Sequence, residues 1–117
     1  MAGSPQRYYL SIEDLSQARS DYAQLSFAGT SPDSFANTLQ AALRTPALWL
    51  RWKALQPDPD AIDDSLGAAD PNATVTAQQA DLHTDIQVVT SLSHAVLKHR
   101  LDMLVGRIWK LRDVASA

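Results

Sequence analysis

The feature that most constrains the fold is an alternation of apolar and polar residues between Thr74 and Leu92. One alternation carries Ala80, Leu82, Thr84, Ile86, Val88 and Thr90. The other carries Gln79, Asp81, His83, Asp85 and Gln87. A period of two residues is typical of a β-strand with one buried face and one polar face. The run therefore predicts a long strand whose polar face is open.

The same run leaves a second interpretation open. Val75 and Ala77 lie on the opposite alternation from Leu82 and Ile86, which is the pattern that a β-bulge or a turn produces. A turn hidden within residues 78–81 would divide the strand into a hairpin. The order of elements would then be ferredoxin-like.

Three helices have recognisable start signals. Ser31 fits an N-cap and Pro32 fits the first helical position. Pro46 should end this helix at Thr45, because proline disfavours helical backbone in the residue before it, and a second helix should follow. Ser93 is the expected N-cap of a third helix, which Gly106 can end. The apolar stripes at helical spacing are Phe35, Leu39, Ala42 and Leu43, then Leu48, Trp49, Trp52 and Leu55, then Val96, Leu97, Leu101, Leu104, Val105 and Ile108.

The remaining segments carry shorter signals. Ser11 and Asp14 fit a capping box, with Leu10 and Leu15 as its hydrophobic staple, so a further helix is expected from Ser11 to about residues 19–22. Beyond it we expect a short strand or ordered arm at residues 7–10, a short strand around Leu25 and Phe27, and a final strand at residues 107–114.

The composition is that of an ordinary globular protein, with 45% hydrophobic and 20% charged residues among 117. This length suits one domain, residues 1–117, with an acidic loop rich in Pro, Asp and Gly at about residues 56–73. Cysteine is absent, which excludes disulfides, thiolate chemistry and Cys-based zinc sites. No apolar stretch approaches the roughly 20 residues of a transmembrane helix, and the N-terminus lacks the core of a secretory signal, so a cytoplasmic location is expected.

Together these elements predict an α+β fold, a small, mostly antiparallel sheet with helices packed on one face. A sheet covered by helices on both faces would carry apolar residues on both alternations of its strands, and the predicted long strand does not. The core between helix and sheet should join Leu101, Leu104 and Ile108 to Leu82, Ile86 and Val88.

Three residues of the polar face raise the question of a metal site. Asp81, His83 and Asp85 are spaced two residues apart, and two carboxylates with an imidazole can bind a divalent cation in a small metal-dependent enzyme. The alternative, which we favour, is that these side chains solvate the open face. No motif marks a catalytic residue or a cofactor site, so none is expected.

Binding to another protein is the function that we expect, with no catalytic activity. The candidate contact residues are Gln79, Asp81, His83, Asp85 and Gln87 on the polar face and Trp49 and Trp52 on one helix face. Tryptophans often dominate binding energy at interfaces, although at helical spacing they are more often core residues. A second copy of the chain is one candidate partner. A secretion-system chaperone or adaptor is an alternative based on size, acidity and lack of cysteine. The net charge of −3 and the lack of a basic run argue against nucleic acid, and no membrane partner is expected.

Overall fold

The computed structural model describes residues 5–20, 22, 24–29 and 31–116. These residues form an antiparallel four-stranded sheet in the order β2-β3-β1-β4. The strands are β1 (Gln6–Ile12), β2 (Thr74–Ala80), β3 (His83–Thr90) and β4 (Trp109–Ser116). The α-helices are α1 (Pro32–Arg44), α2 (Ala47–Ala54) and α3 (His94–Val105). Short 3-10 helices occupy Leu15–Gln17, Pro59–Ala61 and Asp64–Gly67.

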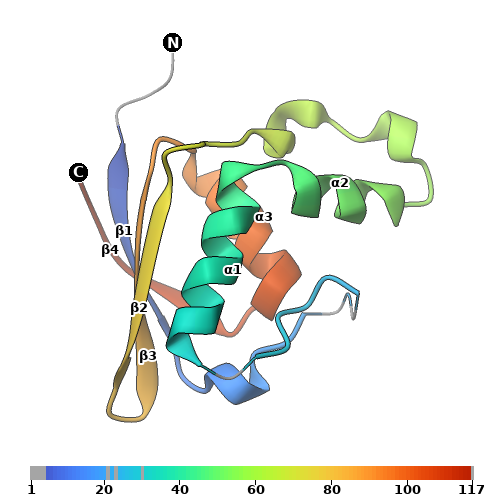
Figure 1. The fold of residues 1–117 in the computed structure, drawn as a ribbon. Helices are drawn as coiled ribbons and strands as arrows, with labels where there is room; N and C mark the ends of the chain where they lie inside the picture. The colour runs from blue at the N-terminus through green and yellow to red at the C-terminus, as the bar shows by residue number, and fades with distance from the viewer. Residues whose placement is uncertain (1–4, 21, 23, 30, 117) are drawn as a thin grey trace.

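The helices lie on one side of the sheet, as Figure 1 shows, with α1 and α3 nearest to it and α2 farther away. The predicted α+β fold with helices on one face is therefore confirmed. The order of strands and of the α1 and α3 helices is β-α-β-β-α-β, which agrees with the ferredoxin-like alternative. Within the described residues, no helix has both the length and the apolar character needed to cross a membrane.

The predicted long strand is a hairpin. Ala80 pairs with His83, so Asp81 and Leu82 form the loop between β2 and β3. Asp81 adopts a φ of 51°, a left-handed conformation that short hairpin loops require and that Asp tolerates better than most residues. Leu82 is 90% exposed at the tip, so its predicted place in the core is wrong. The second interpretation of the run, a hidden turn, is correct.

The N-terminal prediction also needs correction. Ser11 is a residue of β1 and not a helix cap, and the helix that follows is limited to the 3-10 turn Leu15–Gln17. β1 lies between β3 and β4 and pairs with both, and its alternate side chains Leu10 and Ile12 are buried against the helices. Two ladders of backbone hydrogen bonds and this burial outweigh a local capping signal.

The predicted strand around Leu25 and Phe27 is absent, since neither residue belongs to a strand of the described chain. Both side chains are nevertheless buried. The Phe27 N–H donates to the Leu104 carbonyl at 2.8 Å. The Phe27 ring packs edge to face on the Phe35 ring, with 5.2 Å between the ring centroids. This segment therefore packs as an irregular loop against the ends of α1 and α3.

The three predicted helices that follow Ser31, Pro46 and Ser93 are confirmed, and both predicted serine caps are present. The Ser31 hydroxyl accepts from the Ser34 N–H at 3.0 Å, and the Ser93 hydroxyl accepts from the Val96 N–H at 3.3 Å. The helix α1 ends at Arg44, directly before the Thr45-Pro46 pair. Gly106 ends α3 with a φ of 68°, and a Cβ at this position would lie 2.8 Å from the Arg19 carbonyl oxygen.

The core lies between the sheet and the helices α1 and α3. Leu101, Leu104, Ile86 and Val88 are all buried, as predicted. Ile108 is not, because it follows the turn at Gly106 and precedes β4, where it is 38% exposed.

Candidate functional site

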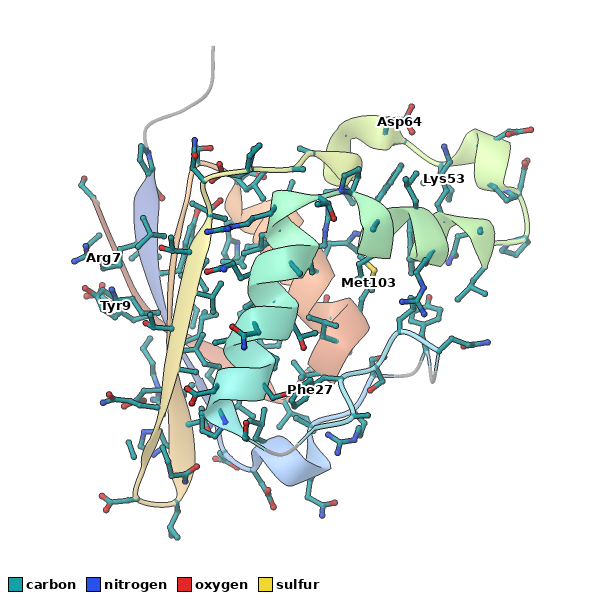
Figure 2. The ribbon with its side chains drawn as sticks, viewed as in Figure 1. Arg7, Tyr9, Phe27, Lys53, Asp64 and Met103 are labelled. Carbon is teal, nitrogen blue, oxygen red and sulfur yellow. The ribbon has the colours of Figure 1, made fainter. Side chains whose placement is uncertain are left out.

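The face of the sheet that the helices leave open carries polar side chains from all four strands. In β1, Tyr8, Leu10 and Ile12 are buried on the helix side, so the alternate residues Arg7 and Tyr9 project to the other side. Figure 2 shows both of these side chains pointing away from the helices. We refer to this surface as the open face.

The strand register determines which other residues share the open face. Tyr9 lies opposite Gln87 of β3, and Gln87 lies opposite Thr76 of β2. On the other side of β1, Tyr9 lies opposite Asp113 of β4. The residues that the register places on this face are Arg7, Tyr9, Ser11, Thr74, Thr76, Gln78, Ala80, His83, Asp85, Gln87, Val89, Lys110, Asp113 and Ala115.

Three of the five predicted polar-face residues lie on the open face, and two do not. His83, Asp85 and Gln87 alternate with buried residues of β3. The two-residue loop changes the phase of β2, so Gln79 faces the helix side, where its Oε1 accepts from the Thr84 hydroxyl at 3.3 Å. Asp81 lies in the loop.

The proposed ligand set for a metal is therefore not assembled. His83 Nε2 and Asp85 Oδ1 are 2.9 Å apart, and both side chains are partly exposed. Asp81 lies outside the strand at the hairpin tip. Across the described part of the chain, no group of three or more His, Cys, Asp or Glu side chains is arranged to hold a metal ion. The His83–Asp85 pair is a partly exposed polar pair at one end of the open face.

A groove of about 420 Å³ lies on the open face. Its polar lining comes from all four strands and consists of Tyr9, Thr76, Gln78, Asp85, Gln87 and Arg112. Arg112 is the extra residue of β4 where the register with β1 shifts. Its Nε donates to the Ser11 hydroxyl at 2.8 Å, which directs the guanidinium across the open face.

Arg7 and Arg112 bring two positive charges to this face, and neither forms a salt bridge within the described residues. The salt bridges of the described residues involve Lys53, His83, Lys98 and Lys110, and neither arginine. The Arg7 Nε atom is buried, and no described residue accepts a hydrogen bond from it. A buried donor without an acceptor is unusual in a folded protein.

The predicted tryptophan contact surface is largely internal. Trp49 is 3% exposed, and a Cβ added to Gly67 would lie 2.9 Å from its ring, so the backbone of the 64–67 turn packs directly on the indole. Trp52 is half-buried and packs edge to face on the His99 ring, with 4.4 Å between the ring centroids. Burial lowers the His99 pKa, and the neighbouring Arg100 lowers it further. The open face is thus the more accessible of the two predicted contact surfaces.

Two buried charged residues hold the acidic loop, in a role that was not predicted from the sequence. Arg100 is fully buried. Its guanidinium donates to the carbonyls of Ala42 at 3.1 Å, Leu66 at 2.6 Å and Ala68 at 2.8 Å. Burial lowers the Arg100 pKa to about 10. Because this value is still well above 7, the side chain stays charged at neutral pH. The available signal was its position four residues after Val96 and four before Leu104, on the apolar stripe of α3.

Asp70 is the second of these residues. Its carboxylate accepts from the Thr90 hydroxyl at 2.8 Å, from the Ser91 N–H at 3.0 Å and from the Asn72 N–H at 3.0 Å. Burial by itself raises the Asp70 pKa, but these hydrogen bonds outweigh burial and lower the pKa below its usual value. Asp70 thereby ties the loop to the end of β3.

Comparison of the chain with protein-family models, with curated proteins and with solved structures gives no match. The geometry of the open face is therefore the basis for assigning a function.

Proposed function

We propose that this chain is a protein-binding module, without catalytic activity of its own, that binds an acidic segment of another protein across the open face. The observation that carries the proposal is the pair of arginines, Arg7 and Arg112, which lie on the open face and form no salt bridge within the described part of the chain. Such guanidinium groups are suited to carboxylates, which they can bind through two parallel hydrogen bonds.

The groove beside Arg112 supports a protein ligand. Gln78 and Gln87 supply side-chain amides that can both donate and accept hydrogen bonds, and Tyr9 supplies an aromatic ring of the kind that contributes most at protein interfaces. Sites for small molecules are usually deep and mostly apolar. This groove has six polar lining residues, drawn from all four strands, and three apolar ones, Leu10, Ala77 and Ile86.

The probe for the proposal is a peptide of about ten glutamates, with a lysine peptide of the same length as control. We expect the glutamate peptide to shift the backbone NMR resonances of β1, β3 and β4 and to bind more weakly as salt increases, because exposed charges are screened. The lysine peptide should cause no such shifts. Shifts that spread evenly over the molecule would contradict the proposal.

Substitutions then test the two arginines. Arg7→Gln combined with Arg112→Gln should weaken binding by at least about tenfold, since a hydrogen bond to a charged group contributes about 1.5–3 kcal/mol. Arg107→Gln is the matched control, because Arg107 is exposed and lies outside the open face. Equal affinity of the double variant and the control would refute the proposed role of the arginines.

A further inference from the structure

The two edges of the sheet differ in how they are covered. At the β2 edge, the Val75 N–H donates to Gln40 Oε1 of α1 at 3.1 Å, and Arg44 of α1 donates to the Ala73 carbonyl at 2.7 Å. At the β4 edge, no backbone group of the described residues bonds to any element other than β1. The Val114 N–H donates to the Asp113 carboxylate at 2.8 Å. An open edge strand can pair with another strand.

The β4 strand also exposes apolar side chains on the helix side of the sheet. Leu111 lies opposite Leu10, and Val114 lies opposite Tyr8. Leu10 and Tyr8 are buried beneath the helices, whereas Leu111 is 38% and Val114 41% exposed. The helices therefore cover β1 and leave the adjacent edge strand uncovered, as the position of β4 away from α1 in Figure 1 illustrates.

The bulge in β4 makes this edge complementary to itself. Leu111 and Val114 share the helix side although they are three residues apart, because Arg112 is an extra residue in the register with β1. Arg112 and Asp113 both belong to the open face. A two-fold axis between Arg112 and Asp113 would place Leu111 opposite Val114 of a second copy and Arg112 opposite its Asp113. Lys110 would then face Ala115, and Trp109 would face Ser116.

In each of these pairs the two residues lie on the same face of the sheet, as antiparallel pairing demands. Other symmetric registers are poorer. Centring the axis on Arg112 would set two arginines opposite each other, and centring it on Leu111 would set Arg112 opposite Lys110. Like charges directly opposite each other are destabilising.

We propose that two copies of this chain pair antiparallel through β4, with the two-fold axis between Arg112 and Asp113, and join their sheets into one continuous sheet. Pairing of a single edge strand buries less surface than the roughly 1,200–2,000 Å² of a standard interface. The dimer is therefore expected to dissociate at micromolar concentrations, on the order of 10–100 µM.

Cysteine cross-linking tests the register, because the chain has no native cysteine. In the proposed dimer, residue 111 of one copy lies about 5 Å from residue 114 of the other. The two copies of residue 111 are three residues out of register, or about 10 Å apart. A mixture of the Leu111→Cys and Val114→Cys variants should form a disulfide-linked dimer on mild oxidation. Each variant alone, and the exposed α2 variant Leu50→Cys, should form much less.

Sedimentation velocity measures the association without a cross-link. The unmodified chain should shift from monomer to dimer as its concentration rises to about 500 µM. Leu111→Lys should abolish this shift, while the control Leu50→Lys, at a side chain 50% exposed on α2, should leave it unchanged. A chain that is monomeric at the highest concentration, a dimer that Leu111→Lys does not weaken, or equal cross-linking in all cysteine samples would overturn the proposal.

Discussion

Replacement of Arg100 by methionine should destabilise the fold more than any change on the open face. Methionine fills a similar volume but has no hydrogen-bond donor. The substitution would therefore leave three backbone carbonyls, those of Ala42, Leu66 and Ala68, without the guanidinium that binds them. These carbonyls belong to the last turn of α1 and to the end of the acidic loop.

The magnitude follows from how accessible these carbonyls are. Ala42 is buried, whereas Leu66 is half-buried and Ala68 is exposed, so water can replace part of the lost bonding only at the latter two. A buried acceptor left without a partner costs about 1–3 kcal/mol, and the loss at the two more accessible carbonyls is smaller because water can bind them. Release of the buried charge from its desolvation offsets some of this loss. The expected decrease in the free energy of unfolding is about 2–4 kcal/mol.

Urea denaturation followed by both far-UV circular dichroism and tryptophan fluorescence measures this change. Arg107→Met is the matched control, since Arg107 is exposed in the turn that follows α3, and it should stay within about 0.5 kcal/mol of the unmodified chain. Arg100→Lys should be intermediate, because an ammonium group cannot reach three carbonyls in the planar geometry of a guanidinium. A change below about 0.5 kcal/mol for Arg100→Met would refute the reasoning, since it would mean that the loop holds without this residue.

Three further predictions concern the loop and the ends of α3. Hydrogen bonds lower the Asp70 pKa. The carboxylate therefore contributes stability above pH about 4, and this contribution is lost as the pH falls through the folded-state pKa. Asp70→Asn should remove this acid dependence in denaturation curves measured from pH 7 to pH 3. Gly106→Ala should lower stability by more than about 1 kcal/mol, because the added Cβ meets the Arg19 carbonyl at a positive φ; an unchanged melting temperature would contradict this. Ser93→Ala should cost about 1 kcal/mol in the same assay while Ser93→Asp costs little, since Asp can also cap α3, and equal losses would argue against the cap.

The elements that could be predicted from the sequence are those that depend on contacts between residues only a few positions apart. The Ser31 and Ser93 hydroxyls bind N–H groups three residues later, so these contacts form wherever the helix forms. Pro46 and Gly106 act on the backbone of their immediate neighbourhood. The open polar face was predictable for a related reason, because alternation along a strand is a property of the strand itself.

The candidate site was only partly predictable. His83, Asp85 and Gln87 belong to one strand, so their common face could be inferred from their spacing. Of the two arginines that carry the proposed function, Arg7 comes from a strand about 80 residues before Gln87, and Arg112 from the strand that follows α3. Their place beside Gln87 depends on which strands pair and in which register, and a single strand contains no information on either.

The sequence by itself determined the Ser31 and Ser93 caps, the helix ends at Thr45 and Gly106, the alternating strand pattern and the exclusion of cysteine chemistry, because each depends on a residue and its near neighbours. The tertiary structure decided whether Ser11 caps a helix or extends β1, whether residues 74–92 form one strand or a hairpin, and whether Arg100 faces water or the core. In each of these cases two local conformations were both acceptable. The choice depended on backbone hydrogen bonds and buried contacts with distant segments, which stabilise only one of the two once the chain is packed.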